Sequence, residues 1–251
     1  MTGCQKLATD LVRRPVTMIV CVGPQSAFAA KAATTTIPIV FVVGADPVEL
    51  GLSTSLSRPS GNLTGINFAS SEVGAKRLEM LRDLLPGATR IAVLVSPADA
   101  RPAELKDVNA AARSMGLQVQ IHNADTSAEI DAAFAAMGRD RPDAVFVGAN
   151  TFFNGRRVQL TQLATFHHLP AIYTGREYAE VGGLMSYGSD IVDAFRLSGV
   201  YAGRILKGAK PADLPIVQAN KFEFIINAQT ARMLGLTIPA PLLNRVDVVI
   251  D

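Results

Sequence analysis

Residues 37–47 read IPIVFVVGADP, an apolar run that is closed by a glycine and an Asp-Pro pair. Within it, Ile37–Val43 shows no alternation of polar and apolar side chains, which is typical of a strand that a parallel sheet buries on both faces. The following Gly44–Pro47 contains the residue types that end a strand and turn the chain. This stretch therefore predicts one central strand of a covered parallel sheet.

The alternation of strands and helices continues on both sides of this run. Before it, Val16–Val22 is predicted to be a strand and Ser26–Thr34 an Ala-rich helix, and Asn62–Asn67 follows as a third strand. A second series of predicted strands, separated by helices, comprises Arg90–Val95, Leu117–His122, Ala144–Val147, Pro170–Tyr173 and Leu184–Tyr187. Thr126 and Glu129 have the spacing of a capping box at one helix start. Two such series predict an α/β protein with two Rossmann-like lobes, each built on a parallel sheet.

Composition and charge exclude several classes of protein. The 251 residues carry 24 Lys and Arg against 22 Asp and Glu, and their 6% aromatic residues do not interleave with basic ones. We therefore expect no nucleic-acid partner. No apolar run reaches the ~20 residues of a membrane span. The two cysteines, Cys4 and Cys21, are too few for a disulfide framework or a four-ligand zinc site.

Motifs for catalysis are missing from the sequence. There is no Gly-x-Ser-x-Gly elbow, no glycine-rich phosphate loop and no His/Cys/Asp/Glu cluster with the spacing of metal ligands. We predict no catalytic residue, no metal and no cofactor. The alternative is a Rossmann-like hydrolase or isomerase that uses Asp46 or Glu177, although neither has a base–nucleophile partner in the sequence.

Polar residues gather where the predicted strands end, and ligands of such folds bind beyond those carboxyl ends. On this basis the predicted ligand-binding residues are Gln25, Ser26, Asp46, Asn67, Ser70, Ser96, Asn150, Thr151, Phe152, Tyr173, Thr174 and Tyr187. The same residue types also suit ordinary turns, helix caps and core packing, so that reading stays open for each position.

Two of these positions suggest a ligand chemistry. Asp46, at the tip of a buried strand, is suited to a ligand ammonium group, unless it only stabilises an Asp-Pro turn. Ser70, at a helix start, is suited to a ligand carboxylate, unless it is only a cap. Together they would select an α-amino acid, with Phe152, Tyr173 and Tyr187 as apolar walls.

A set of ordered motifs spans nearly the whole chain. They are Ile37–Phe41 running into Asp46–Val48 and Gly51-Leu52, Arg58-Pro59 with Gly61–Gly65, Gly74–Glu79, Gly182–Gly188, Gly203–Gly208 with Lys210–Pro215, and Lys221–Glu223 near Ile226-Asn227. This pattern resembles the bacterial ABC-transporter substrate-binding protein family that includes tryptophan- and other aromatic-amino-acid-binding members.

The resemblance implies a type I periplasmic-binding-protein fold, in which a hinge closes two lobes on the ligand. It places residues 1–68 with about 185–208 in the N-terminal lobe, and 69–184 with about 209–251 in the C-terminal lobe. Members carry solutes to a permease in the inner membrane and do no chemistry. The resemblance thus implies a periplasmic protein that captures a small polar solute, an aromatic or branched amino acid.

The amino end departs from the family pattern. Members carry a secretion signal and about two further strands before the segment that begins here, so the first lobe is expected to lack its first strands. Val16–Val22 would then be an exposed edge strand, and edge strands pair readily with other chains. The expectation is a homodimer through that edge, and the alternative is a degenerate copy that no longer binds a ligand.

Overall fold

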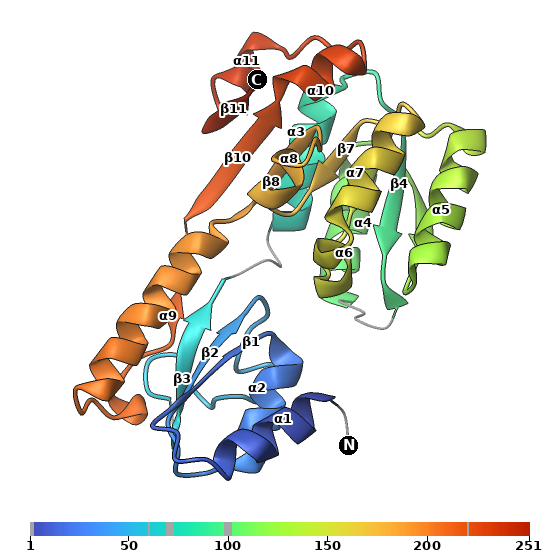
Figure 1. Ribbon diagram of the computed structural model, residues 1–251. Coiled ribbons are helices and arrows are strands. Elements are labelled where there is room, and N and C mark those ends of the chain that lie inside the picture. Colours follow the sequence, from blue (N-terminus) through green and yellow to red (C-terminus); the bar gives the residue numbers. More distant parts are fainter. Residues whose placement is uncertain (1–2, 60, 69–72, 98–101, 220) are drawn as a thin grey trace. The chain divides into compact units, whose positions relative to one another are not determined.

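The computed structural model describes residues 3–59, 61–68, 73–97, 102–219 and 221–251. The chain forms two compact units, each made of two separate segments (Figure 1). Unit 1 comprises Met1–Ala69 and Asp190–Lys221, and unit 2 comprises Ser70–Ser189 and Phe222–Asp251. The chain therefore crosses between the units three times. In the described part of the chain, no helix is both long and apolar enough to cross a membrane.

Unit 1 is built on a parallel sheet with the strand order β1-β2-β3-β9. Its strands are β1 (Ile19–Val22), β2 (Ile39–Val43), β3 (Leu63–Asn67) and β9 (Val217–Gln218). Helices α1 (Gly3–Val12) and α2 (Pro24–Ala33) belong to one face, the long α9 (Ile191–Leu206) covers the other, and a short 3-10 helix spans Pro211–Asp213 (Figure 1).

The central strand β2 explains why both faces are covered. Successive side chains of a strand point to opposite faces. Phe41 accordingly packs on the face that is covered by Ala27 and Ala30 of α2. Val40 and Val42 pack on the other face, with α9 residues such as Tyr201. All five residues of β2 are 0% exposed. The continuous apolar run of the sequence is therefore the consequence of two-sided burial, as predicted.

Unit 2 is built on a larger sheet with the order β11-β10-β8-β7-β6-β4-β5. Its strands are β4 (Arg90–Val95), β5 (Gln118–Asn123), β6 (Ala144–Val147), β7 (Ala171–Tyr173), β8 (Met185–Ser189), β10 (Phe222–Asn227) and β11 (Val248–Ile250). Every pairing is parallel except that of β10 with β8. The prediction of parallel sheets is thus correct with one antiparallel exception.

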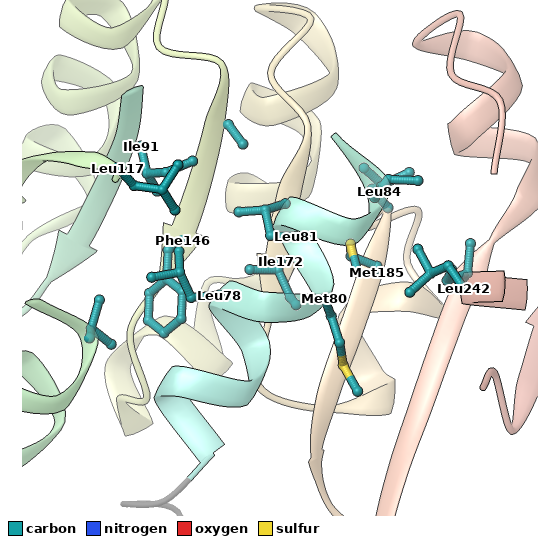
Figure 2. Packing of buried hydrophobic residues seen from close by; sticks show 14 of the residues in the cluster. Leu78, Met80, Leu81, Leu84, Ile91, Leu117, Phe146, Ile172, Met185 and Leu242 are labelled. Atoms are coloured by element: carbon teal, nitrogen blue, oxygen red, sulfur yellow. The ribbon is translucent and has the colours of Figure 1, made fainter. Parts of the chain in front are cut away.

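Helices cover both faces of this second sheet as well. One face packs on α3 (Val73–Leu84), α4 (Pro102–Ser114), α10 (Ala228–Met233) and α11 (Ala240–Leu243). Figure 2 shows this core, in which Leu78 and Leu81 of α3 lie near Phe146 and Ile172 of the sheet. The other face packs on α5 (Ser127–Asp140), α6 (Thr151–Gly155), α7 (Arg157–Phe166) and α8 (Arg176–Ala179).

The unit boundaries differ from the predicted ones after residue 184. Residues 185–189 form β8, which pairs with β7 and β10 and so belongs to unit 2. Residues 209–221 belong to unit 1, because β9 pairs with β3 and the Thr64 hydroxyl donates to the Leu214 carbonyl at 2.7 Å. The crossovers lie at 189/190 and 221/222, one residue before α9 and directly before β10.

Candidate ligand-binding site

The carboxyl ends of β1 and β2 in unit 1 carry three predicted residues that hydrogen bond locally or face solvent. Gln25 is exposed at the start of α2. The Ser26 hydroxyl donates to the carbonyls of Val22 and Gly23 at 2.6 and 3.0 Å. Asp46 Oδ1 accepts from the backbone N–H groups of Val48 and Glu49, at 2.7 and 3.4 Å. The turn role of Asp46 is therefore present, and its contact with a ligand stays a prediction.

Asn67, the last residue of β3, differs from these neighbours. Its side chain is buried, with 2% of the residue exposed, and its backbone carbonyl accepts from Ala219 at 2.8 Å. Among the described residues, its side-chain Oδ1 has no hydrogen-bond partner. Leaving a buried polar atom unsatisfied costs about 1–3 kcal/mol, so this oxygen is suited to an incoming donor. Ser70, the predicted carboxylate-binding residue, lies outside the described residues.

Two predicted residues of unit 2 stabilise the loops that follow β4 and β6. The Ser96 hydroxyl donates to Asp125 Oδ1 at 2.5 Å and so joins the loops after β4 and β5. Asn150 is the N-cap of α6, and its Oδ1 accepts from the N–H groups of Phe152 and Phe153 at 2.6 and 3.1 Å. This cap fixes where α6 begins, because it satisfies N–H groups that have no partner within the helix.

The first residues of α6 are more accessible than Asn150. Thr151 is exposed and Phe152 is half-buried, whereas Phe153 points into the core. The Arg156 guanidinium lies 5.8 Å from the centre of the Phe152 ring. Thr151 and Phe152 are thus available at the carboxyl end of β6.

Tyr173 lies in the core, which was the alternative to its predicted role as a wall. It is 0% exposed, and its ring stacks on Tyr178 with 4.7 Å between the ring centres. Burial raises the pKa of its hydroxyl, which has no hydrogen-bond partner among the described residues. We therefore leave Tyr173 out of the proposed contacts. The neighbouring Thr174 is half-buried.

Tyr187 on β8 belongs to an aromatic cluster that the sequence reasoning missed in part. Its ring stacks on Phe222, with centres 5.8 Å apart, and meets Phe224 edge-on at 6.3 Å. Tyr187 and Phe222 are both half-buried. Phe222 was missed because it is the first residue of the predicted strand Phe222–Ile226, whereas the search was confined to strand ends. The antiparallel pairing of β10 brings it opposite Ser189, at the end of β8.

An ion pair flanks this cluster. Arg176 donates through Nε and Nη2 to the two oxygens of Glu223, at 3.0 and 2.8 Å. Such two-bond pairs fix the geometry of both side chains. The pair therefore joins α8 to β10, the strand that carries Phe222.

In the ranges that the structure describes, no group of three His, Cys, Asp or Glu side chains could hold a metal ion. Cys21 is a free, buried thiol whose pKa burial raises to about 12, so it is not an activated nucleophile.

The described candidates fall into two sets. Gln25, Ser26, Asp46 and Asn67 lie at the carboxyl end of the unit 1 sheet. In unit 2, Ser96, Asn150–Phe152 and Thr174 lie just after strand ends, and Tyr187 lies within β8. Two α/β units of this kind, which share a chain that crosses between them three times, define the type I periplasmic-binding class of proteins.

Comparison with known proteins places the chain within that class. The pattern of the family described as "ABC transporter substrate binding protein" matches residues 4–250, and the chain belongs to this family. The family is one of binding proteins rather than enzymes.

Three relatives illustrate the similarity. A tyrosine-binding protein of Clostridioides difficile (strain R20291) is 26% identical over 238 residues, which are 94% of this chain and 68% of the relative. An ABC domain from Streptococcus pneumoniae, solved in complex with L-Trp, is 26% identical with a TM-score of 0.87, over 98% of this chain and 85% of that one. A conserved domain protein from Vibrio cholerae O1 biovar El Tor has the same identity and TM-score, with 98% and 82% covered.

Proposed function

We propose that the solute bound by this substrate-binding protein is an amino acid with an aromatic or branched side chain. The observation that carries the proposal is the half-buried pair of stacked rings, Tyr187 and Phe222, beside the end of β8. A third ring stacks favourably on such a pair, and this adds about 0.5–1.5 kcal/mol to the burial of its area. The relatives that bind tyrosine and L-Trp support the same ligand class.

Unit 1 is proposed to bind the polar end of the solute. The Asn67 Oδ1 and the carboxylate of Asp46 are acceptors, and a protonated amino group offers up to three N–H donors. Ser70, which belongs to unit 2, is proposed for the solute carboxylate. The remaining predicted contacts are Gln25, Ser26, Ser96, Asn150, Thr151, Phe152 and Thr174.

The first experiment is thermal unfolding of the chain against L-tryptophan, L-tyrosine, L-phenylalanine, L-leucine, glycine and benzoate. A ligand present at a hundred times its Kd stabilises the folded state by about 2.7 kcal/mol. For a chain of this size, the midpoint is expected to rise by roughly 5–10 °C. A shift with benzoate alone, or with none of the amino acids, would overturn the proposal and favour another ligand class or a non-binding copy.

A pair of variants tests whether the stacked rings of Tyr187 and Phe222 form an aromatic wall of the binding site. Tyr187→Leu keeps an apolar side chain but removes the ring that stacks on Phe222, so affinity for the aromatic amino acids should fall about tenfold. Phe166→Leu, at a 76% exposed position on α7, is the matched control and should bind as the parent does. Isothermal titration calorimetry gives both dissociation constants, and equal losses in the two variants would argue against the wall.

Delivery to a permease and a place outside the cytoplasmic membrane complete the proposed role. Substrate-binding proteins of ABC systems bind small molecules and work with such permeases. Stimulation of solute uptake by membrane vesicles that contain the candidate permease would test the partnership. No stimulation by the solute-loaded protein would contradict it.

The edge strand β1 is proposed to pair with β1 of a second copy. It is at the end of the described sheet order, and its outward residues Val20 and Val22 are 50% and 54% exposed. An exposed apolar edge is a template for another strand. Multi-angle light scattering should give a dimer that Val20→Lys dissociates. Val249→Lys, on an exposed position of β11, is the control, and a monomeric parent chain would contradict the pairing.

A further inference from the structure

A buried ion pair in unit 2 joins three elements that meet where β6 ends. Arg77 of α3 is 1% exposed, and its Nη2 donates to Glu104 in the first turn of α4. Its Nη1 donates to the carbonyl of Val147, the last residue of β6, at 2.9 Å. The guanidinium also lies over the ring of Phe146, 4.4 Å from its centre.

The same pair extends past the end of the strand. The backbone N–H of Ala149 donates to both oxygens of Glu104, at 3.3 and 3.4 Å. Arg77 and Glu104 therefore contact the chain on both sides of Gly148. Gly148 itself lies close to β4, since a Cβ added there would be 3.1 Å from the Leu94 carbonyl. Asn150, the residue after Ala149, is the N-cap of α6.

A contribution to the stability of the fold does not by itself explain why this position holds a buried ion pair. Removing two charges from water costs several kcal/mol for each ion, and apolar residues of similar volume are often as stabilising. A buried pair also fixes the local backbone geometry, because each of its hydrogen bonds holds one backbone group in place. Here the fixed groups are the Val147 carbonyl and the Ala149 N–H, directly before the proposed contacts Asn150, Thr151 and Phe152.

We propose that Arg77 and Glu104 are positioning residues for solute binding, which hold the backbone of residues 147–149 so that Asn150–Phe152 meet the solute in one fixed geometry. This inference rests on the proposed function, since it needs a solute at the carboxyl end of β6. Arg77 and Glu104 themselves do not contact the solute. Their effect is transmitted through the start of α6.

The test compares two arginine pairs that share helix α3. The double variant Arg77→Met with Glu104→Leu replaces the buried pair with apolar side chains. Its control is Arg245→Met with Asp83→Leu, which removes a more exposed arginine that bonds Asp83 on α3 at 2.6 Å. Thermal midpoints, calorimetric Kd values for the amino acid that binds the parent, and amide hydrogen exchange are measured for both.

The expected result separates positioning from stability. The buried-pair variant should keep its thermal midpoint within a few degrees while its Kd rises at least tenfold, and the control should change neither. Exchange at the amides of Ala149, Phe152 and Phe153 should be at least tenfold faster in the buried-pair variant. An unchanged Kd together with a lowered midpoint would overturn the inference and leave the pair a purely structural role.

Two further arms keep the test decisive. Arg77→Lys retains the charge, but its Kd should also be higher than that of the parent chain. An ammonium group lacks the planar fork that reaches both Val147 and Glu104. If no amino acid binds the parent chain, the proposed function fails. The exchange measurement still decides the inference in that case, because protection at Ala149, Phe152 and Phe153 that is unchanged by the double substitution would overturn it.

Discussion

The ends of the two sheets are held by different kinds of contact. In unit 1, Ser26 bonds carbonyls three and four residues earlier, and Asp46 bonds N–H groups two and three residues later. In unit 2, Ser96 bonds Asp125, Arg77 bonds Val147 and Arg176 bonds Glu223, so the partners are 29 to 70 residues apart.

This difference indicates how each unit presents its candidate residues. A loop held by its own neighbours is free to move as one piece, whereas a loop tied to other elements keeps its place in the unit. Unit 2 therefore presents a preorganised surface, and preorganisation raises affinity because less order is lost on binding. Unit 1 presents adaptable turns together with Asn67, whose side-chain oxygen has no hydrogen-bond partner among the described residues.

The largest change in the free energy of unfolding is expected from replacing one glycine in each sheet. A Cβ at Gly65 would lie 2.2 Å from the Phe41 carbonyl, and a Cβ at Gly188 would lie 1.8 Å from the Thr174 carbonyl. Because backbone atoms cannot yield as a side chain does, Gly65→Ala and Gly188→Ala should each cost about 3 kcal/mol. Hydrogen exchange should show the loss in unit 1 for the first variant and in unit 2 for the second.

Gly199→Ala is the matched control for both glycine variants. It lies in α9 with nothing within 4 Å of an added Cβ, so it should be neutral or stabilise by about 0.5–1 kcal/mol. A loss that spreads equally over both units in either sheet variant would contradict the separate character of the units.

A pH series compares an aspartate of each unit. Hydrogen bonds from Thr89 and Arg90 backbone groups, at 2.7 and 2.8 Å, hold the pKa of Asp143 below its ordinary 3.8. Lys221, at 2.8 Å, and the N–H of Asp193 do the same for the pKa of Asp190, the N-cap of α9. At pH 7, Asp143→Asn and Asp190→Asn should each lower the free energy of unfolding by about 1 kcal/mol.

The sign of the pH dependence follows from the lowered pKa values. The stabilisation is complete above the unfolded-state pKa and is lost as the pH falls through the lower folded-state pKa. Urea titrations from pH 7 to pH 2 should therefore show each variant approaching the parent chain at the acid end. Salt should weaken the Asp190 effect more, because its Lys221 partner is 65% exposed in its side chain.

Two buried tyrosines, one in each unit, should change the free energy of unfolding in opposite directions. The Tyr201 hydroxyl in unit 1 donates to the Pro215 carbonyl at 2.6 Å, so Tyr201→Phe should destabilise by about 1 kcal/mol. Tyr173→Phe in unit 2 removes a buried hydroxyl that has no partner in the described residues, and it should stabilise by about 1 kcal/mol. Urea denaturation measures both, and a loss of stability in Tyr173→Phe would reveal a bound water or another partner.

Local patterns in the sequence predicted much of the fold. The strand Ile39–Val43 follows from its continuous apolar run, and the capping box of Thr126 and Glu129 forms as its spacing indicates. Both signals are complete within a few residues. The antiparallel pairing of β10 with β8 and the place of residues 209–221 in unit 1 depend on strands that are distant in the sequence. No local pattern therefore predicts them.

The candidate site shows the same limit. Strand ends led to Asn67 and Asn150, because a parallel sheet places its carboxyl ends together. The stacking of Phe222 on Tyr187 depends on an antiparallel neighbour, and the contacts of Arg77 depend on Glu104 and Val147, which lie 27 and 70 residues away. The core position of Tyr173 could not be told from a wall position by residue type alone.

The interleaved path of the chain has a consequence during synthesis. One face of the unit 1 sheet carries Val40, Val42 and Ile66, and it is covered by α9 and the segment that follows α9. A ribosome adds about 5–20 residues each second, so the segment that ends at Lys221 emerges roughly 8–30 s after Ala69. During that interval the apolar face is open to chaperones, and a nascent chain stalled near residue 180 should bind them more strongly than the finished protein.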